Sequence, residues 1–206
     1  MANNYLITGA KGAGKTTLLA RLLRQLDLKT AGFTVKRINA RNGRPLLFEL
    51  RQAAELKEKG AAGLKSRADL NFSAASKVEA DQADAEKCQK IFAYRENTKE
   101  KFRVKADVFN NLGLELLRQQ GEVVVMDELG RFELKAQKFQ KEVFSLLASE
   151  KIVIGVLKAE SNPFLDRIRE RDDLNIYQLK DQNEGQKADI FNKLLEDLKN
   201  IAAVKL

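Results

Sequence analysis

A glycine-rich segment near the start of the chain, from Gly9 to Thr16, has the residue types and spacing to bind phosphate. It reads GAKGAGKT and matches the phosphate-binding loop G-x-x-x-x-G-K-[ST]. Glycines let the backbone curl so that successive N–H groups point at phosphate oxygens, and the N-terminus of a following helix adds partial positive charge. We expect Lys15 to reach the β- and γ-phosphates of a nucleoside triphosphate and the Thr16 hydroxyl to hold Mg²⁺.

The other residues of this segment are expected to bind phosphate through the backbone more than through side chains. The side chain of Lys11 should point outward, because that position of the loop supplies its backbone N–H group. Thr17 follows the metal-binding threonine, and its N–H group or hydroxyl is expected to touch the α-phosphate. The predicted nucleotide-binding residues are therefore Gly9, Ala10, Lys11, Gly12, Ala13, Gly14, Lys15, Thr16 and Thr17.

Two carboxylates, Asp127 and Glu128, directly follow the apolar run Val123–Met126. At the carboxyl end of a buried strand, Asp127 is placed to hold Mg²⁺, directly or through water. Glu128 points away from its neighbour and can polarise the attacking water as a general base. Buried strands also often end in a solvated acidic turn, and the phosphate-binding loop upstream is what favours the functional interpretation. The predicted catalytic residues are Lys15 and Glu128, and the predicted metal ligands are Thr16 and Asp127.

The composition narrows the chemistry further. The chain contains no histidine, which excludes His general bases, Ser–His and Cys–His nucleophile pairs and His-ligated zinc. Carboxylates, Lys, Arg, hydroxyls and a hard oxygen-bound metal remain, and this set suits phosphoryl transfer with Mg²⁺. The single cysteine, Cys88, cannot form an internal disulfide, which fits a reducing cytoplasmic setting. Its polar surroundings favour a half-buried small residue over a reactive thiol.

The net charge of +8 and the sequence pI of about 9.5 raise the question of polyanionic partners. Basic residues are scattered without a long run, and aromatic residues make up only 7% of the chain. Nucleic-acid binding is therefore not expected as the main role. No stretch approaches the about 18 apolar residues that suggest a membrane span, and the strand-like start leaves no room for a signal peptide. We expect a cytoplasmic protein.

Apolar runs and helical periodicity predict an α/β fold. The later runs are continuously apolar, as expected for strands buried on both faces of a parallel sheet. Strands alternate with helical segments, so we expect a doubly wound, mostly parallel sheet of about five core strands flanked by helices. Ligands of such sheets bind at the carboxyl ends of the strands. The six predicted strands are Tyr5–Thr8, Phe33–Ile38, Leu46–Leu50, Val123–Met126, Ile152–Leu157 and Ile176–Leu179.

Four helices are predicted after the one that follows the phosphate-binding loop. Asp107 is expected to cap a helix over residues 108–117, and Ser161 or Asn162 to cap a helix with Pro163 in its first turn. A third helix is expected over residues 136–149. The last is expected over residues 186–201, with a core stripe of Ile190, Leu194, Leu195 and Leu198.

Two segments depart from simple alternation. Residues 33–50 are expected to form an added β-hairpin, because Asn42-Gly43 between apolar runs is a strong tight-turn signal. Residues 51–100 are charge-rich with weak periodicity, and we interpret them as surface helices or a partly mobile cover. A length of 206 residues predicts one domain, residues 1–206, and the chain shows no internal repeat and no low-complexity linker.

Taken together, several of these segments resemble the small nucleoside-triphosphatase family first described from thermophiles. The resemblance covers about residues 1–50 and 100–185. Its most specific parts are the D-E-L-G-x-x-E-L stretch, from Asp127 to Leu134, and Gly32-Phe33 at the start of the hairpin. The resemblance implies a single-domain phosphate-loop protein with a five-stranded core sheet. It also implies hydrolysis of ATP and other nucleoside triphosphates with Mg²⁺ and with broad base tolerance.

Other functions remain as alternatives. Asp127–Gly130 also matches the D-x-x-G of GTP switches, but the chain has no Asn-Lys-x-Asp guanine motif. A small-molecule or nucleotide kinase could use residues 51–100 as an acceptor lobe, and a slow ATP-dependent protein could regulate a protein partner. Phosphoryl transfer also benefits from a further cation. The candidates, each also readable as a surface charge, are Lys36, Arg37, Arg41, Arg44, Arg131, Arg167, Arg169 and Arg171.

Overall fold

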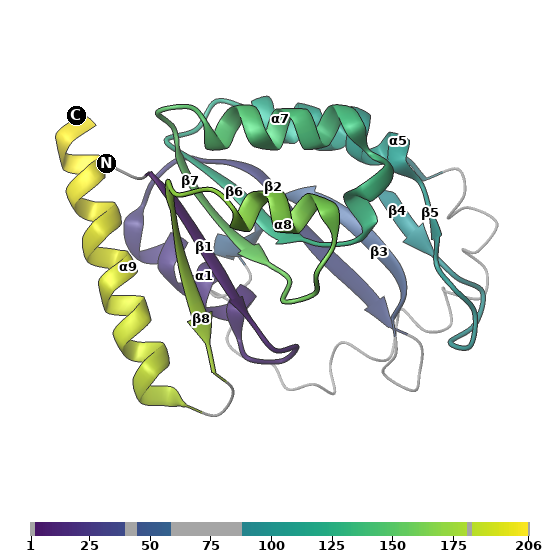
Figure 1. Ribbon diagram of the computed structural model, residues 1–206, viewed down its shortest axis with the longest axis horizontal. Coiled ribbons are helices and arrows are strands. Elements are labelled where there is room, and N and C mark those ends of the chain that lie inside the picture. Colours follow the sequence, from purple (N-terminus) through teal and green to yellow (C-terminus); the bar gives the residue numbers. More distant parts are fainter. Residues whose placement is uncertain (1–2, 40–44, 59–87, 181–182, 206) are drawn as a thin grey trace.

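A computed structural model shows one twisted β-sheet with helices on both of its faces (Figure 1). It describes residues 3–39, 45–58, 88–180 and 183–205. The eight strands lie in the order β5-β4-β3-β2-β6-β7-β1-β8. Their bounds are β1 Asn4–Gly9, β2 Thr30–Asn39, β3 Pro45–Gln52, β4 Ile91–Tyr94, β5 Arg103–Val104, β6 Val123–Leu129, β7 Ile152–Leu157 and β8 Leu174–Leu179.

The helices connect these strands. The α-helices are α1 Lys15–Leu26, α2 Glu55–Glu58, α5 Ala106–Val108, α6 Leu114–Arg118, α7 Gln137–Leu147, α8 Pro163–Arg169 and α9 Glu184–Lys205. A π-helical turn, η1 Phe109–Gly113, joins α5 to α6, and a 3-10 turn, η2 Phe132–Lys135, follows β6.

Five neighbouring strands, β2-β6-β7-β1-β8, are parallel to one another. β3, β4 and β5 extend the sheet beyond β2 as antiparallel strands. The α/β class, the mostly parallel sheet with a core of five strands, and the added β2–β3 hairpin are all confirmed. The Asn42-Gly43 turn itself lies outside the described residues.

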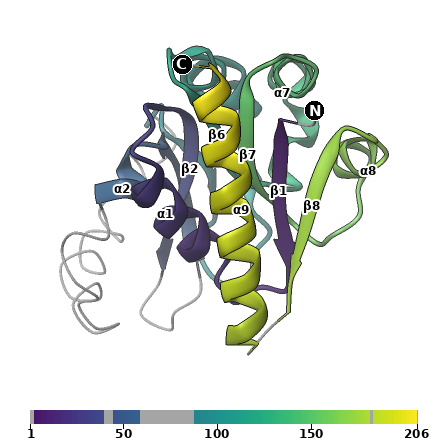
Figure 2. The same cartoon turned by 90° about the vertical axis from the view of Figure 1, so that its left-hand side faces the viewer.

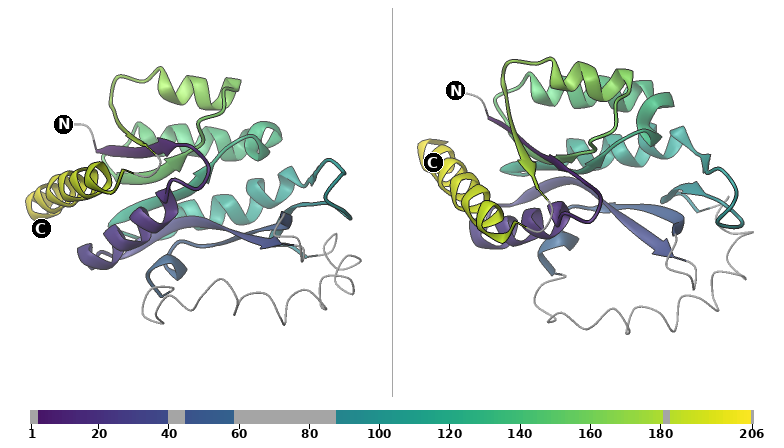
Figure 3. Two further views of the ribbon diagram at one scale, coloured as in Figure 1. Left: turned by 90° about the horizontal axis from the view of Figure 1, so that it is seen from below. Right: turned by 60° about the horizontal axis from the view of Figure 1, so that its bottom comes forward.

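Alternate side chains of the central strands enter two separate cores. On β6, Val124 and Met126 pack with α7 and α8 on one face, whereas Val123 and Val125 pack with α1 and α9 on the other. Figures 2 and 3 show this layering, with α1 and α9 on one side of the sheet and α7 and α8 on the opposite side. Continuously apolar strands are thus explained by helices covering both faces.

The strand order decides which chain segments meet at the carboxyl edge. β7 lies between β1 and β6, so the phosphate-binding loop after β1 and the Asp127–Glu128 pair near the end of β6 belong to strands that are not direct neighbours. β2 borders β6 on its other side, and the parallel directions bring the ends of all four strands to one edge. Whatever follows β7 therefore lies between the loop and the two carboxylates.

The interpretation of residues 51–100 as helices or cover is wrong for its last part. Ile91–Tyr94 forms β4, which pairs antiparallel with β3 and is largely buried. Short length and flanking charges hide this strand, because four residues show no clear alternation. The short helix α2 does lie in the segment, and residues 59–87 are outside the described part of the chain.

Helix ends were predicted with mixed success. Asn162 caps α8 by accepting hydrogen bonds from the N–H groups of Phe164 and Leu165, with Pro163 in the first turn as expected. Asp107 is not a cap: the helix begins one residue earlier at Ala106, and Asp107 is exposed in its first turn. A carboxylate there still complements the partial positive charge of a helix start.

The last helix is longer than predicted and has a different core stripe. α9 begins at Glu184 and extends to Lys205. Leu194 and Leu198 are buried as expected, but Ile190 and Leu195 are only partly buried. Phe191, which the periodicity did not select, takes their place in the core beneath the guanidinium of Arg21.

Candidate functional site

The segment Gly9–Thr16 forms a turn between β1 and α1, as the loop pattern predicts. Gly12 and Gly14 have φ of +92° and +89°, a conformation that L side chains rarely adopt. Gly14 is also the N-cap of α1, so the first N–H groups of the helix face the concave side of the loop. The local backbone thus favours glycine at these positions, one of which, Gly14, is a defining glycine of the motif.

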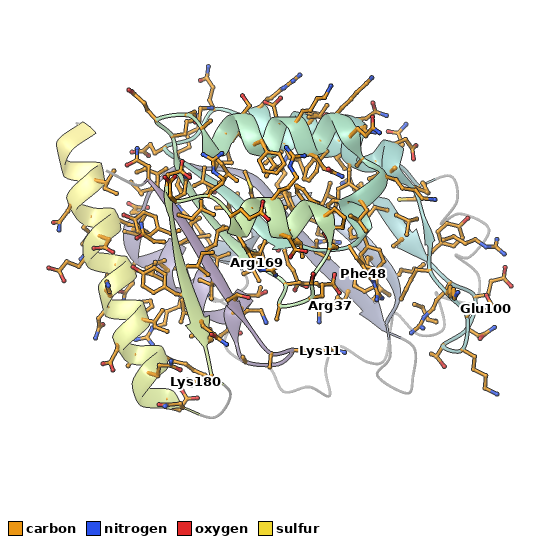
Figure 4. All side chains as sticks on the ribbon, in the orientation of Figure 1. Lys11, Arg37, Phe48, Glu100, Arg169 and Lys180 are labelled. Atoms are coloured by element: carbon orange, nitrogen blue, oxygen red, sulfur yellow. The ribbon has the colours of Figure 1, made fainter. Side chains whose placement is uncertain are left out.

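Lys15 turns back over the loop that precedes it. Its Nζ donates hydrogen bonds to the carbonyl oxygens of Gly9, at 2.8 Å, and of Ala10, at 2.7 Å. Burial lowers the pKa of Lys15 below its usual value, and two nearby cations act in the same direction. Lys11 and Thr17 are exposed, Lys11 at the tip of the loop. Figure 4 shows Lys11 at the same edge of the molecule as Arg37.

Asp127 is a buried carboxylate that accepts two hydroxyl hydrogen bonds. Thr16 donates to its Oδ1 at 2.9 Å, and Thr34, on β2, donates to its Oδ2 at 2.8 Å. The side chain of Asp127 is 1% exposed, and this burial raises its pKa to about 6 despite the two hydrogen bonds. Thr34 was not a predicted site residue, since a threonine inside a strand carries no signal of its own.

The oxygen atoms around Asp127 fit a magnesium ion. Asp127 has only neutral hydroxyl groups as hydrogen-bond partners and its pKa remains raised although Arg37 acts to lower it, so a divalent cation would stabilise its charged form. The described residues contain no cluster of three or more His, Cys, Asp or Glu that could form an all-protein cage. Mg²⁺ needs no such cage, because it binds through one or two protein oxygens plus phosphates and water.

Glu128 lies between two basic side chains. Its Oε2 is 2.9 Å from Nη2 of Arg37, and its Oε1 is 3.1 Å from Nζ of Lys158. Arg37 comes from β2, and Lys158 is the first residue after β7. Arg37 was among the candidate cations, but Lys158 was not. A lysine directly after a fully buried apolar strand at the ligand-binding edge is the signal that could have found it.

A second buried carboxylate, Glu133, lies beneath this cluster. It is 2% exposed, and burial raises its pKa to about 7, while the positive charge of Lys158 opposes the shift. Its Oε2 accepts a hydrogen bond from the N–H group of Gly130 at 3.0 Å. Glu128, Glu133 and Lys158 line a cavity of about 10 Å³, a volume comparable to what one water molecule needs. The hydrogen bond between Gly130 and Glu133 therefore stabilises the turn after β6.

In the described part of the chain, none of the other candidate cations forms an ion pair with Asp127 or Glu128. Arg169 is committed to carbonyl oxygens, including that of Lys158, and Arg171 binds Asp173. Arg131 and Arg167 lie over the rings of Phe132 and Phe144, with guanidinium-to-ring distances of 5.4 and 4.5 Å. Lys36 is next to Arg37 on β2, but the ion pairs of Glu128 are those with Arg37 and Lys158. Arg41 and Arg44 are outside the described residues.

The site residues from α1, β2, β6 and the end of β7 influence one another electrostatically. The pKa of Lys15 responds to Glu128 and Asp127, which raise it, and to Arg37 and Lys158, which lower it. The structure therefore brings the phosphate-binding loop, both carboxylates and the two flanking cations into one place. The site combines hydrogen-bond donors for phosphate, oxygen ligands for a hard metal ion, and a carboxylate beside a cavity about the size of a water molecule.

Comparison with known proteins places this geometry in a family. A family model described as NTPase matches residues 4–195. The nucleoside-triphosphatase THEP1 of Thermotoga sp. (strain RQ2) is 29% identical over 194 residues, which is 94% of each chain. The cancer-related nucleoside-triphosphatase homolog of Mus musculus is 25% identical over 212 residues, covering 96% of this chain and 95% of the relative.

Solved structures share the fold. THEP1 from the hyperthermophile Aquifex aeolicus superposes with a TM-score of 0.59 at 20% identity, covering 95% of this chain and 96% of that one. A human cancer-related nucleoside triphosphatase gives a TM-score of 0.56 at 22% identity, with 97% and 96% covered. The family match and the fold agree over nearly the whole length. The chain therefore belongs to the small P-loop NTPase family, whose members are hydrolases that act on nucleoside triphosphates.

Proposed function

We propose that this chain hydrolyses ATP, GTP and other nucleoside triphosphates at the γ-phosphate in the presence of Mg²⁺. One observation carries the proposal: Thr16, in the first turn of the helix after the phosphate-binding loop, donates a hydrogen bond to Asp127, and Glu128 follows Asp127 directly. In this proposal, the hydrogen-bond donors for phosphate, the metal ligands and the carboxylate of Glu128 therefore share one site. The remaining phosphate-binding residues in this proposal are residues 9–14, including Lys11, and Thr17.

Each residue has a defined role in this proposal. Lys15 and the loop N–H groups bind the phosphates, for which Lys15 leaves the carbonyl oxygens of Gly9 and Ala10. Thr16 and Asp127 would hold Mg²⁺, which when bound neutralises charge on the β- and γ-phosphate oxygens. Glu128 orients a water molecule and accepts its proton as the oxygen attacks phosphorus. All of these groups contact the triphosphate or the water, and none contacts a base.

Base selectivity is not expected to be strong. Asn183, in the segment where guanine-selective proteins carry their recognition motif, uses its Oδ1 to accept a hydrogen bond from the N–H group of Gln186 at 2.9 Å. Its side chain thus caps the start of α9. We therefore expect similar hydrolysis rates with ATP and with GTP, in line with relatives whose names specify no base.

The decisive test is phosphate release by wild type and Glu128→Gln. The substitution keeps the size of the side chain but removes the proton acceptor, so we expect kcat to fall by roughly 10²–10⁴-fold. Glu142→Gln is a matched control, because Glu142 also pairs with an arginine, Arg118 at 2.6 Å, on the outer surface of α7. An unchanged rate in Glu128→Gln would show that Glu128 is not the base.

Product analysis separates hydrolysis from the alternatives. A kinase would yield a nucleoside diphosphate and a phosphorylated acceptor with little free phosphate. A slow partner-regulating protein would bind nucleotide tightly and turn over only when its partner is added. Within the described residues no helix is long and apolar enough to cross a membrane. With Cys88 unpaired and half-buried, we place the protein in the cytoplasm as part of this proposal.

A further inference from the structure

Both carboxylate oxygens of Glu128 are engaged in this structure. Arg37 binds one at 2.9 Å and Lys158 binds the other at 3.1 Å, and the Glu128 side chain is 12% exposed. A carboxylate that is shared between two cations is poorly placed to accept a proton from water. The arrangement seen here must therefore change before Glu128 can act as proposed.

The two cations reach Glu128 from opposite sides because of the strand order. β6 carries Glu128, and its two neighbours in the sheet are β2, which carries Arg37, and β7, which leads into Lys158. Figure 4 shows Arg37 on the edge that also carries Lys11 of the phosphate-binding loop. A phosphate group bound in that loop would therefore lie near the same two cations, Arg37 and Lys158.

The charges at this edge favour an anion. Lys15, Arg37 and Lys158 lie close enough to affect one another, and both Arg37 and Lys158 lower the pKa of Lys15. These three cations lie near two carboxylates, Glu128 and the buried Asp127. A γ-phosphate adds negative charge and several oxygen acceptors, and Arg and Lys bind phosphate oxygens through strong charge-assisted hydrogen bonds.

The two basic side chains can change partner without unfolding their strands. Arg37 is 40% exposed, so its guanidinium can turn from one anion to another at the surface without leaving a buried position. Lys158 is held along its stem: its Cδ lies over Gly130, where an added Cβ would come within 2.8 Å, and its Nζ is 5.4 Å from the centre of the Phe132 ring. Its backbone is fixed by Arg169, which leaves only the ammonium end to move.

We propose that Arg37 and Lys158 form a two-cation clamp that reads the γ-phosphate. The clamp holds Glu128 until a triphosphate binds, then transfers to γ-phosphate oxygens and leaves the carboxylate free to face water. This inference rests on the proposed function. It predicts that the chain distinguishes a triphosphate from a diphosphate through these two side chains, because a diphosphate has no group that can take Glu128's place.

The test compares binding of a non-hydrolysable ATP analogue and of ADP, both with Mg²⁺, by calorimetry. Arg37→Ala and Lys158→Ala should each weaken the analogue by about tenfold or more and change ADP by less than about twofold, as expected for loss of a charged hydrogen bond. Arg37→Lys should restore part of the difference. Arg118→Ala is the matched control, since Arg118 pairs with Glu142 far from the site, and it should change neither affinity.

A second variant makes the clamp falsifiable on its own. Glu128→Gln removes the competing anion, so it should bind the ATP analogue more tightly than wild type while ADP binding stays constant. Equal losses for both nucleotides in Arg37→Ala and Lys158→Ala, or unchanged analogue binding in Glu128→Gln, would overturn the clamp. If wild type released no phosphate from any triphosphate, the proposed function itself would fail, whatever the binding data showed.

Discussion

Burial raises the pKa of two carboxylates near the site, and hydrogen bonds to each carboxylate act in the opposite direction. Asp127 and Glu133 are both buried, and burial raises the pKa of each, to about 6 and about 7. Asp127 accepts hydrogen bonds from two hydroxyl donors, whereas Glu133 accepts from backbone N–H groups, including that of Gly130, and lies near a lysine. The same kind of group, a buried carboxylate, thus has hydroxyl partners beside the phosphate-binding loop in one place and a backbone partner in the turn after β6 in the other.

Glu133 predicts a pH dependence of stability. Its pKa rises from 4.5 to about 7 on folding, so the folded chain holds this proton more tightly than the unfolded chain. The contribution of Glu133 to the free energy of unfolding is therefore unfavourable above about pH 7 and disappears as the pH falls toward 4.5. A shift of this size corresponds to about 3 kcal/mol at high pH.

Urea unfolding of wild type and Glu133→Gln at pH 5 and pH 8 checks this prediction. The amide of the variant still offers an oxygen to the N–H group of Gly130 but carries no charge, so the variant should gain stability relative to wild type as the pH rises. Lys158 and Glu128 are the charged groups that act on Glu133, and they oppose each other. A stability difference that is the same at both pH values would contradict the prediction.

At the scale of elements, close contacts between parallel strands set the position of the site. Gly32 of β2 has φ of +94°, and a Cβ added there would lie 2.0 Å from the carbonyl oxygen of Val125 on β6. This contact holds β2 against β6, and β2 carries both Thr34 and Arg37 toward the carboxylates. The glycine at this position therefore helps to position Thr34 and Arg37 beside the carboxylates.

Gly32→Ala should destabilise the protein by roughly 3 kcal/mol or more, because the backbone conformation and the steric clash both oppose a side chain. Gly185→Ala is a useful control. Gly185 is exposed in the first turn of α9, and an added Cβ would make only an ordinary 3.7 Å contact. That change should be neutral or slightly stabilising. Denaturant midpoints measure both, and equal midpoints for wild type and Gly32→Ala would contradict the clash.

At the scale of the whole molecule, the site exists only when the sheet is complete. Its groups come from the β1–α1 loop, from β2, from β6 and from the residue after β7. Binding a ligand at this shared edge should therefore stabilise the folded chain as a unit. Since the unfolded chain lacks the site, the gain follows from mass action.

A Mg²⁺-bound ATP analogue at 100 times its dissociation constant should add about 2.7 kcal/mol to the free energy of unfolding. The measurement is thermal or denaturant unfolding with the analogue, with Mg²⁺ alone and without either. Lys15→Ala, which removes the loop cation, should show a much smaller gain at the same analogue concentration. Unfolding that is unaffected by saturating analogue in wild type would argue against a binding site at this edge.

The sequence by itself determined those features that depend on contiguous residues. The phosphate-binding loop, the Asp127-Glu128 pair and the Asn162 cap could be predicted because each follows from local backbone geometry and side-chain chemistry. The parallel core was also predictable, since strands covered on both faces must be continuously apolar. The strand β4 was missed because it is short and its neighbours are charged.

Only the tertiary structure decided which residues surround the two carboxylates. Thr34, Arg37 and Lys158 reach Asp127 and Glu128 from β2 and from the end of β7, and this depends on the order β2-β6-β7-β1. Strand order results from how the helices pack on both faces of the whole sheet, which no local pattern records. For that reason the two carboxylates could be named from the sequence and Arg37 only as one of several candidate cations, while Lys158 and Thr34 could not be named.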